Sequence, residues 1–144
     1  MKMKIKCLKN NKSLPKYQTE GSSGMDLTAG IDEPVEIKPL ERKLIPTGIS
    51  IELPIGYEAQ VRARSGLSIK HGITLINAIG TIDSDYRGEV CVGLINLSNE
   101  VYTINPNDRI AQMVIMKIEQ AQIEVETELS ETERGSGGFG STGY

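Results

Sequence analysis

The chain has 144 residues, of which 38% are hydrophobic, and its formal net charge is −3. A chain of this length is expected to form one domain that buries most of its apolar surface. Charges of both signs are mixed along it, without the basic stripe that neutralises a nucleic-acid backbone, so no polynucleotide partner is expected. No apolar run reaches the length that spans a bilayer, which predicts a soluble, cytoplasmic protein.

Apolar and polar residues alternate from end to end, which is typical of short strands. The alternation covers residues 3–7, 35–37, 49–53, 57–63, 90–94 and 123–125, and turn signals such as Asp32-Glu-Pro34 and Asn105-Pro-Asn-Asp108 separate these segments. This spacing predicts an all-β protein, a β-sandwich or jelly roll. Only Ser65 to His71 could form a helical turn.

Two later segments carry further structural information. Strands at 73–79 and 90–97 flank a polar stretch, which predicts a hairpin arm with Asp83, Asp85, Tyr86 and Arg87 near its tip. The stretch from Arg109 to Ile118 is almost wholly apolar, and within its central residues 110–116 the one polar side chain is the amide of Gln112. A strand that is apolar on both faces is covered on both sides, and another subunit is one source of that cover.

The cysteines and the histidine limit the chemistry. Cys7 and Cys91 lie far apart in apolar contexts, which predicts two buried, reduced thiols rather than a disulfide. With His71 as the only histidine, neither a zinc site nor a Cys–His nucleophilic pair has the residues it needs. Any catalysis must therefore use carboxylates, arginines and a hard metal ion.

Taken singly, the remaining motifs are ambiguous. Asp26 follows a glycine turn and could simply cap it. The segment Arg64 to Ser68 could form an anion-binding nest or a plain connection from strand to turn. The glycine-rich stretch from Arg134 to Tyr144 has the composition of a linker, yet it carries the only phenylalanine, Phe139, and could close as a lid over a phosphorylated, flat-ringed ligand.

The combination is far more specific. In order, the chain presents Ser23-Gly-Met-Asp-Leu-Thr-Ala29, Arg64-Ser-Gly-Leu-Ser-Ile-Lys-His-Gly72, Asn77-Ala-Ile-Gly-Thr-Ile-Asp-Ser-Asp-Tyr-Arg-Gly-Glu89, Asp108-Arg-Ile-Ala-Gln112 and Arg134-Gly-Ser-Gly-Gly-Phe-Gly-Ser-Thr-Gly143. These segments closely resemble the five ordered motifs of the trimeric deoxyuridine triphosphatase (dUTPase) family. The resemblance runs from the Leu14-Pro15 lead-in to the C-terminus.

The resemblance implies a jelly-roll protomer, a homotrimer with three shared active sites, and hydrolysis of dUTP to dUMP and pyrophosphate with Mg²⁺. Such an activity limits uracil incorporation into DNA and supplies dUMP for thymidylate synthesis. It further implies that residues 1–133 form the β domain and that residues 134–144 form a flexible lid over the active site.

Carried over residue by residue, the resemblance implies that Asp83 is the base that activates water for attack on the α-phosphorus. The base and sugar would be held by Asn77, Gly80, Thr81, Ile82, Tyr86, Cys91 and Phe139, with Tyr86 leaving no room for a 2′-hydroxyl. The phosphates would be held by Arg64, Ser65, Gly66, Gln112, Arg134, Ser141 and Thr142. Asp26 would hold waters of the Mg²⁺ shell.

Other residues are expected to be structural. Arg109 would form an ion pair with Asp108 or with another subunit, and Asp85 and Arg87 would lie at the surface or an interface. Asn107 stands where relatives often have glycine, and Asn tolerates the same left-handed conformation. Two other functions remain open: a dCTP deaminase-like enzyme of the same fold, and a non-catalytic trimer that binds dUTP as a signal.

Overall fold

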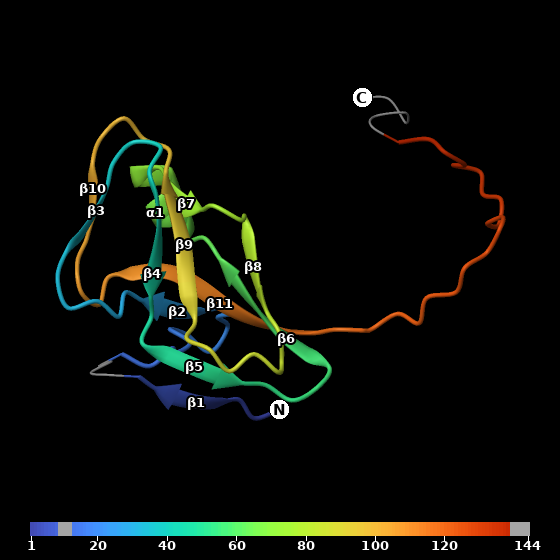
Figure 1. Cartoon of the computed structure of the whole chain (residues 1–144), viewed down its shortest axis with the longest axis horizontal. Coiled ribbons are helices and arrows are strands. Elements are labelled where there is room, and N and C mark those ends of the chain that lie inside the picture. Colours follow the sequence, from blue (N-terminus) through green and yellow to red (C-terminus); the bar gives the residue numbers. More distant parts are fainter. Residues whose placement is uncertain (9–12, 139–144) are drawn as a thin grey trace.

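The structure is a computed structural model that describes residues 1–8 and 13–138 (Figure 1). In these ranges it consists of strands and one short helix, in the order β1 (Lys4–Cys7), β2 (Met25–Thr28), β3 (Val35–Ile37), β4 (Arg42–Pro46), β5 (Ile49–Glu52), β6 (Tyr57–Arg62), α1 (Ser65–His71), β7 (Ile73–Leu75), β8 (Ile79–Ile82), β9 (Cys91–Asn96), β10 (Tyr102–Ile104) and β11 (Arg109–Lys117). Within the described residues, no helix is long and apolar enough to cross a membrane.

The strands form two main sheets and two ribbons. The larger sheet has the order β2-β11-β6-β8 and the smaller one β4-β9-β7, while β1 pairs with β5 and β10 with β3. Every pairing is antiparallel. The all-β jelly-roll fold predicted from the alternation is therefore confirmed.

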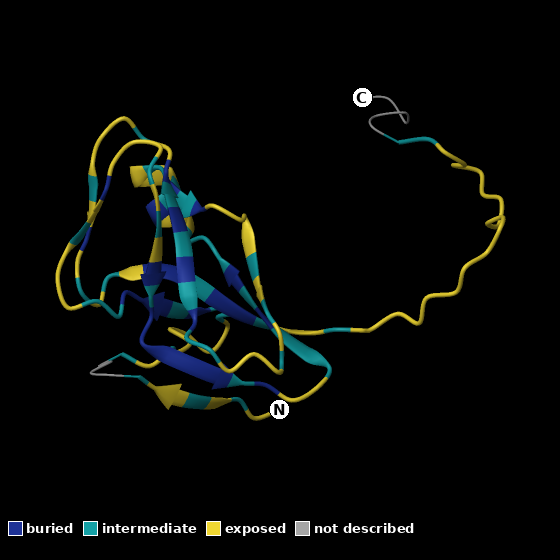
Figure 2. Cartoon of the chain, in the orientation of Figure 1, coloured by how far each residue is buried: buried dark blue, intermediate teal, exposed yellow. Residues whose placement is uncertain are grey.

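The core lies between the facing sides of these sheets (Figure 2). Residues on β9 alternate between half-buried and buried, so that Val92 and Leu94 point into the core while Cys91 and Gly93 face the other way. Leu27, Leu94 and Met113 are at most 1% exposed. Each such side chain contributes roughly 1.5–3 kcal/mol by leaving water, and together they fix how the two sheets face each other.

Helix α1 matches the predicted helical turn residue for residue. It ends because Gly72 adopts a left-handed φ of 67° and donates its N–H to the Ser68 carbonyl at 2.9 Å. Glycine enters that region without the steric cost of a Cβ atom. The short helix thus turns the chain directly from β6 into β7.

Two strand predictions need correction. The stretch 73–79 is not one strand: it breaks after Leu75, and the new strand β8 pairs with β6 instead of returning along β9. No strand forms at residues 123–125, which lie on an extended arm beyond Lys117 (Figure 1, orange to red). The alternating pattern there has no paired neighbour in the single chain, and an unpaired strand is not stable in water.

Two burial predictions also need correction. Strand β11 lies between β2 and β6, and its residues Ile110, Ala111, Met113 and Val114 are buried by their own chain, so this strand needs no partner subunit to cover it. Both cysteines are unpaired, as expected, but neither is fully buried: Cys91 is half-buried, and Cys7 is exposed because β1 is an outer strand that pairs only with β5.

Candidate active site

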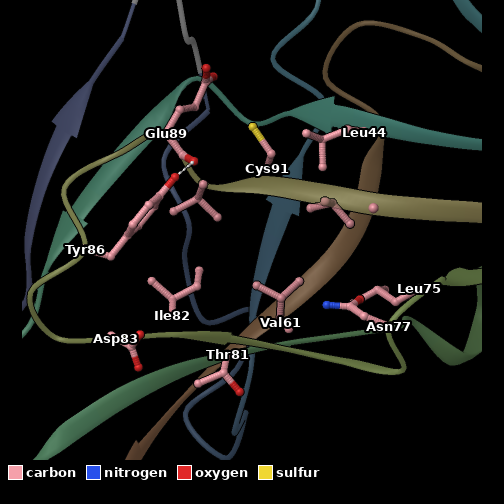
Figure 3. A pocket seen from close by; sticks show the side chains of 14 residues that line it. Leu44, Val61, Leu75, Asn77, Thr81, Ile82, Asp83, Tyr86, Glu89 and Cys91 are labelled. Carbon is pink, nitrogen blue, oxygen red and sulfur yellow. Dashed lines mark hydrogen bonds between the residues drawn. The ribbon is translucent and has the colours of Figure 1, made fainter.

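A pocket of about 360 Å³ opens where the two main sheets approach each other (Figure 3). Strands β6 and β8 of the larger sheet and β4, β7 and β9 of the smaller one contribute to its lining. The lining includes all seven residues expected to contact the base and sugar or to activate water within the described ranges, namely Asn77, Gly80, Thr81, Ile82, Asp83, Tyr86 and Cys91. The structure therefore brings these predicted residues together.

The turn between β7 and β8 places Asn77 at the pocket. Ala78 has a φ of 60°, and the Ile79 N–H donates to the Asn77 carbonyl at 2.6 Å. A Cβ atom on Gly80 would lie 3.3 Å from Cβ of Val61 and 3.4 Å from Nδ2 of Asn77. The missing side chain at Gly80 thus lets β8 lie close to β6 with the Asn77 amide beside it.

Strand β8 also offers backbone groups. It stands at the edge of the larger sheet, paired with β6 on one side, and no described strand pairs with its other side. The N–H and C=O groups on a strand edge can hydrogen-bond to a ligand as they would to an added strand. A planar ring with its own donors and acceptors fits this edge.

Residues 83–90, called here the 83–90 loop, connect β8 to β9 across the pocket. Inside the loop the Tyr86 N–H donates to the Asp83 carbonyl at 3.2 Å, and Arg87 Nη1 donates to the Ser84 carbonyl at 2.7 Å. Asp83 and Tyr86 are exposed, so both face solvent at the pocket rather than the core. A carboxylate there can accept a proton from a bound water.

Cys91 lines the pocket at the start of β9. Burial raises the pKa of its thiol, and the negative charge of Glu89 raises the pKa further. The thiol therefore stays protonated at neutral pH and is unsuited to act as a nucleophile.

A second group of predicted residues gathers at β2, β11 and the end of β6. The Asp26 carboxylate forms ion pairs with Nε of Arg64 at 2.9 Å and with Nη1 of Arg109 at 3.2 Å. Gln112 lies opposite Asp26 in the β2–β11 pairing and donates Nε2 to the Ala63 carbonyl at 2.9 Å. Ser65 and Gly66 are exposed at the start of α1. None of these residues lines the pocket.

The partner of Arg109 differs from the expected one. Its guanidinium binds Asp26, whereas Asp108 Oδ2 accepts a hydrogen bond from the Asn105 N–H at 2.8 Å within its own turn. Asn107 has a φ of 67°, so the left-handed conformation expected at this position is confirmed.

The donors around Asp26 bear on Mg²⁺. No group of three or more His, Cys, Asp or Glu side chains within residues 1–8 and 13–138 is arranged to hold a metal ion. Both Asp26 oxygens already bind arginines, yet a carboxylate has about four acceptor positions, so it can still accept hydrogen bonds from water. This geometry fits a residue that holds metal-bound waters and does not fit a direct ligand.

The predicted lid is described only in part. Arg134 is exposed on the extended arm and donates Nε to the Gly137 carbonyl at 2.8 Å, so its guanidinium contacts the arm itself and not the pocket. Phe139, Ser141 and Thr142 lie outside the described residues.

Sequence reasoning missed several pocket residues. Val61 comes from β6 of the larger sheet, and Leu44, Leu75 and Gly93 come from β4, β7 and β9 of the smaller one. Nothing in the local sequence distinguishes them from other strand residues. Glu89 was visible at the end of the third motif, but its contact with Gly48 spans 41 positions and has no sequence signal.

Comparisons with known proteins agree with this arrangement. The family model described as dUTPase matches residues 10–143. A deoxyuridine 5′-triphosphate nucleotidohydrolase from Finegoldia magna is 62% identical over 146 residues, covering 99% of this chain and 100% of that protein. One from Fusobacterium nucleatum is 63% identical over 131 residues, covering 90% of this chain and 89% of that protein.

Solved structures show the same fold. A mutant dUTPase of Staphylococcus bacteriophage 80alpha, with dUpNHpp, has a TM-score of 0.91 at 26% identity and covers 99% of both chains. A mutant dUTPase from phage phi11 of S. aureus, in which a structural Mg(II) ion is coordinated, has a TM-score of 0.83 at 22% identity and bears on the fold alone. With the family model spanning nearly the whole sequence and relatives above 60% identity, this chain belongs to the dUTPase family.

Proposed function

We propose that this protein hydrolyses dUTP to dUMP and pyrophosphate, with the base and sugar bound in the pocket between the two sheets. The pocket is the observation that supports this proposal. Its lining combines the Asp83 carboxylate and the Tyr86 ring, both on the 83–90 loop, with the open edge of strand β8. Membership of the dUTPase family and relatives named as deoxyuridine 5′-triphosphate nucleotidohydrolases support the same reaction. Nothing among these relatives favours the deaminase or the non-catalytic alternative.

Uracil recognition is assigned to Asn77 and to the backbone of Gly80, Thr81 and Ile82. The edge of β8 presents donors and acceptors that match the uracil edge, and the Asn77 amide lies beside it. Cytosine would place a donor opposite a donor, and discrimination against such a mispaired group is strong. Cys91 would add a backbone contact from β9, and Tyr86 would lie against the deoxyribose.

Asp83 is assigned the role of the base that accepts a proton from the attacking water. It is the one carboxylate on the pocket lining besides Glu89, within the described residues, and Glu89 is already bound to the Gly48 N–H. Phosphoryl transfer needs charge neutralisation and positioning more than covalent help. Arg64, Ser65, Gly66 and Gln112 are assigned to the phosphates, and Asp26 to the waters of a Mg²⁺ ion that would neutralise phosphate charge.

We further propose a homotrimer in which each site is shared between subunits. In one chain the described residues assigned to the phosphates lie outside the pocket that holds the base and sugar, so a neighbour is the natural source of the missing group. The extended arm exposes Ile123, Val125 and Leu129 at 86%, 94% and 88%, and such residues are expected to be covered by a partner.

The lid assignment also remains a proposal. Within the described part of the chain, regular structure ends at Lys117, so residues 118–133 would reach a neighbouring subunit and residues 134–144 would close over its site. Arg134, Ser141 and Thr142 are assigned to the γ-phosphate, and Phe139 to stacking on uracil. The cytoplasmic location expected from the sequence stays a prediction.

Pyrophosphate release from dUTP, dCTP and UTP with Mg²⁺ tests the function directly. We expect turnover of dUTP alone, and loss of a positioned base in Asp83→Asn should lower kcat by about 100-fold or more. Asp85→Asn removes the same charge from the same loop and serves as the matched control, with kcat nearly unchanged. Near-normal kcat in Asp83→Asn would overturn the assignment of the base, and release of ammonia from dCTP would favour the deaminase.

A further inference from the structure

The 83–90 loop carries both Asp83 and Tyr86, yet it is tied to the rest of the described chain at one place. Its hydrogen bonds to the body all run to the turn between β4 and β5, residues 47–48, and to Ile49 at the start of β5. The Val90 carbonyl accepts from the Thr47 N–H at 3.1 Å and from the Thr47 hydroxyl at 2.5 Å, and the Val90 N–H donates to the Ile49 carbonyl at 2.8 Å. The loop is therefore held at its C-terminal end.

Glu89 extends this attachment toward the pocket. Its carboxylate Oε1 accepts a hydrogen bond from the Gly48 N–H at 2.8 Å, and its carbonyl accepts one from the Tyr86 hydroxyl at 3.1 Å (Figure 3). Gly48 has a φ of 72°, so its N–H is oriented by a turn that favours glycine. One residue thus links the body of the sheet to the tyrosine ring.

Gly88 supplies the space for that ring. A Cβ atom added at Gly88 would overlap the hydroxyl and the adjacent ring carbon of Tyr86. The ring therefore lies directly on the backbone at Gly88, with its hydroxyl bound one residue farther on. The position of Tyr86 depends on residues 88 and 89 together, not on the loop tip.

We propose that Glu89 is a positioning residue for sugar discrimination: its bond to Gly48 fixes the backbone that seats Tyr86, and so sets the wall that excludes a 2′-hydroxyl. The inference rests on the proposed function, in which Tyr86 lies against the deoxyribose. Glu89 acts through its acceptor oxygen rather than its charge, because a backbone N–H is neutral and needs only an acceptor. A glutamine would keep that oxygen, and an alanine would not.

The test compares kcat/KM for dUTP and for UTP across matched variants. Loss of the acceptor in Glu89→Ala should lower the dUTP-to-UTP ratio by about tenfold, mainly through a higher KM for dUTP and a lower one for UTP. Glu89→Gln should keep the ratio within about twofold, since it keeps the acceptor. Gly88→Ala leaves the Gly48 bond but displaces the ring, and should resemble Glu89→Ala. Asp85→Ala removes a carboxylate from the same loop and should leave the ratio unchanged.

Amide hydrogen exchange supplies a readout that does not depend on turnover. In Glu89→Ala the Gly48 amide and the amides of the 83–90 loop should exchange faster, whereas those of β5 and β9 stay protected. Glu89→Gln should exchange like the wild type. An unchanged ratio in Glu89→Ala, or an equal loss in Glu89→Ala and Glu89→Gln, would overturn the proposal.

Failure of the proposed function would look different. If Tyr86→Ala left the dUTP-to-UTP ratio unchanged, the sugar assignment itself would be wrong, whatever Glu89 does to the loop. If Tyr86→Ala lowered the ratio and Glu89→Ala did not, only the role of Glu89 would be lost.

Discussion

The Asp26 carboxylate binds two guanidinium groups, and the two pairs differ in their access to water. The Asp26 side chain is 14% exposed, that of Arg64 27% and that of Arg109 53%. Exposed ion pairs are screened by solvent and contribute little, whereas removal of a shared, half-buried anion leaves two cations side by side. The residue that sequence reasoning assigned to metal-bound water therefore also has a structural role.

We expect Asp26→Asn to lower the free energy of unfolding more than Arg109→Ala does. The first should cost about 1–3 kcal/mol, because charged hydrogen bonds are lost at a half-buried site, and the second about 0.5 kcal/mol. Urea unfolding at one fixed protein concentration measures both, and the Arg109→Ala difference should shrink further in 1 M salt, where the Debye length is about 3 Å. A larger loss in Arg109→Ala than in Asp26→Asn would contradict this ranking.

At the scale of elements, three turns of the described chain place non-glycine residues in the left-handed region: Leu40 has a φ of 61° in the β3–β4 connection, and two further turns flank the site. Ala78 has a φ of 60° in the turn that carries Asn77, and Asn107 has a φ of 67° in the turn before β11. Asn adopts this conformation more easily than Ala, because its side chain can hydrogen-bond locally. The β7–β8 turn therefore stores more backbone strain than the β10–β11 turn.

Ala78→Gly should stabilise the protein by about 1 kcal/mol, because removal of the Cβ relieves more strain than the added chain entropy costs. Ala78→Val should destabilise it, since a β-branched residue with this φ is an outlier. Asn107→Gly is the matched control and should change stability little. Urea midpoints for the three variants measure the effect, and a destabilised Ala78→Gly would show that the turn is not strained.

The sequence predicts those elements whose pattern lies within a short stretch of the chain, and it does not predict those that depend on pairing with a distant strand. The helix, the jelly-roll class and strands β1, β3, β5 and β6 follow from alternation and turn residues near one another in the chain. Strand β4 carries Arg42, Lys43 and a terminal Pro46, so it shows no alternation, and it forms because β9 pairs with it. The pairing of β8 with β6 likewise depends on the facing sheet, which no local pattern encodes.

The site divides in the same way. Seven pocket residues lie close together in the sequence, between Asn77 and Cys91, and the sequence predicts them as a group, whereas the lining residues outside this stretch have no such signal. Contacts that span the fold could not be predicted: the Asp26 pairs with Arg64 and Arg109, and the Glu89 bond to Gly48. These contacts join residues far apart in the sequence, and only the tertiary structure brings them within hydrogen-bond distance.

At the scale of the whole molecule, the described arm beyond Lys117 is the part that does not pack against the body of its own chain. It leaves the body without pairing, and nearly all of its described length is coloured as exposed (Figure 2). Its exposed residues include the large apolar Ile123, Val125 and Leu129. The buried strand β11, by contrast, is satisfied within its own chain. The arm and the divided site therefore favour association of chains, whereas β11 does not require it.

Two truncations separate association from closure, and we expect them to behave differently. Deletion of residues 134–144 should leave stability and trimer mass nearly unchanged, because Arg134 makes its described side-chain hydrogen bond within the arm, while kcat falls because the triphosphate is no longer held for attack. Deletion of residues 119–144 should also weaken association, because it removes the exposed apolar residues of the arm.

Mixing Asp83→Asn with the 134–144 deletion should then restore part of the activity, since a mixed trimer can combine an intact Asp83 with an intact lid from another chain. Light scattering gives the mass and pyrophosphate release the activity. Full activity as a monomer, or no recovery on mixing under conditions that exchange subunits, would show that each chain builds its own site.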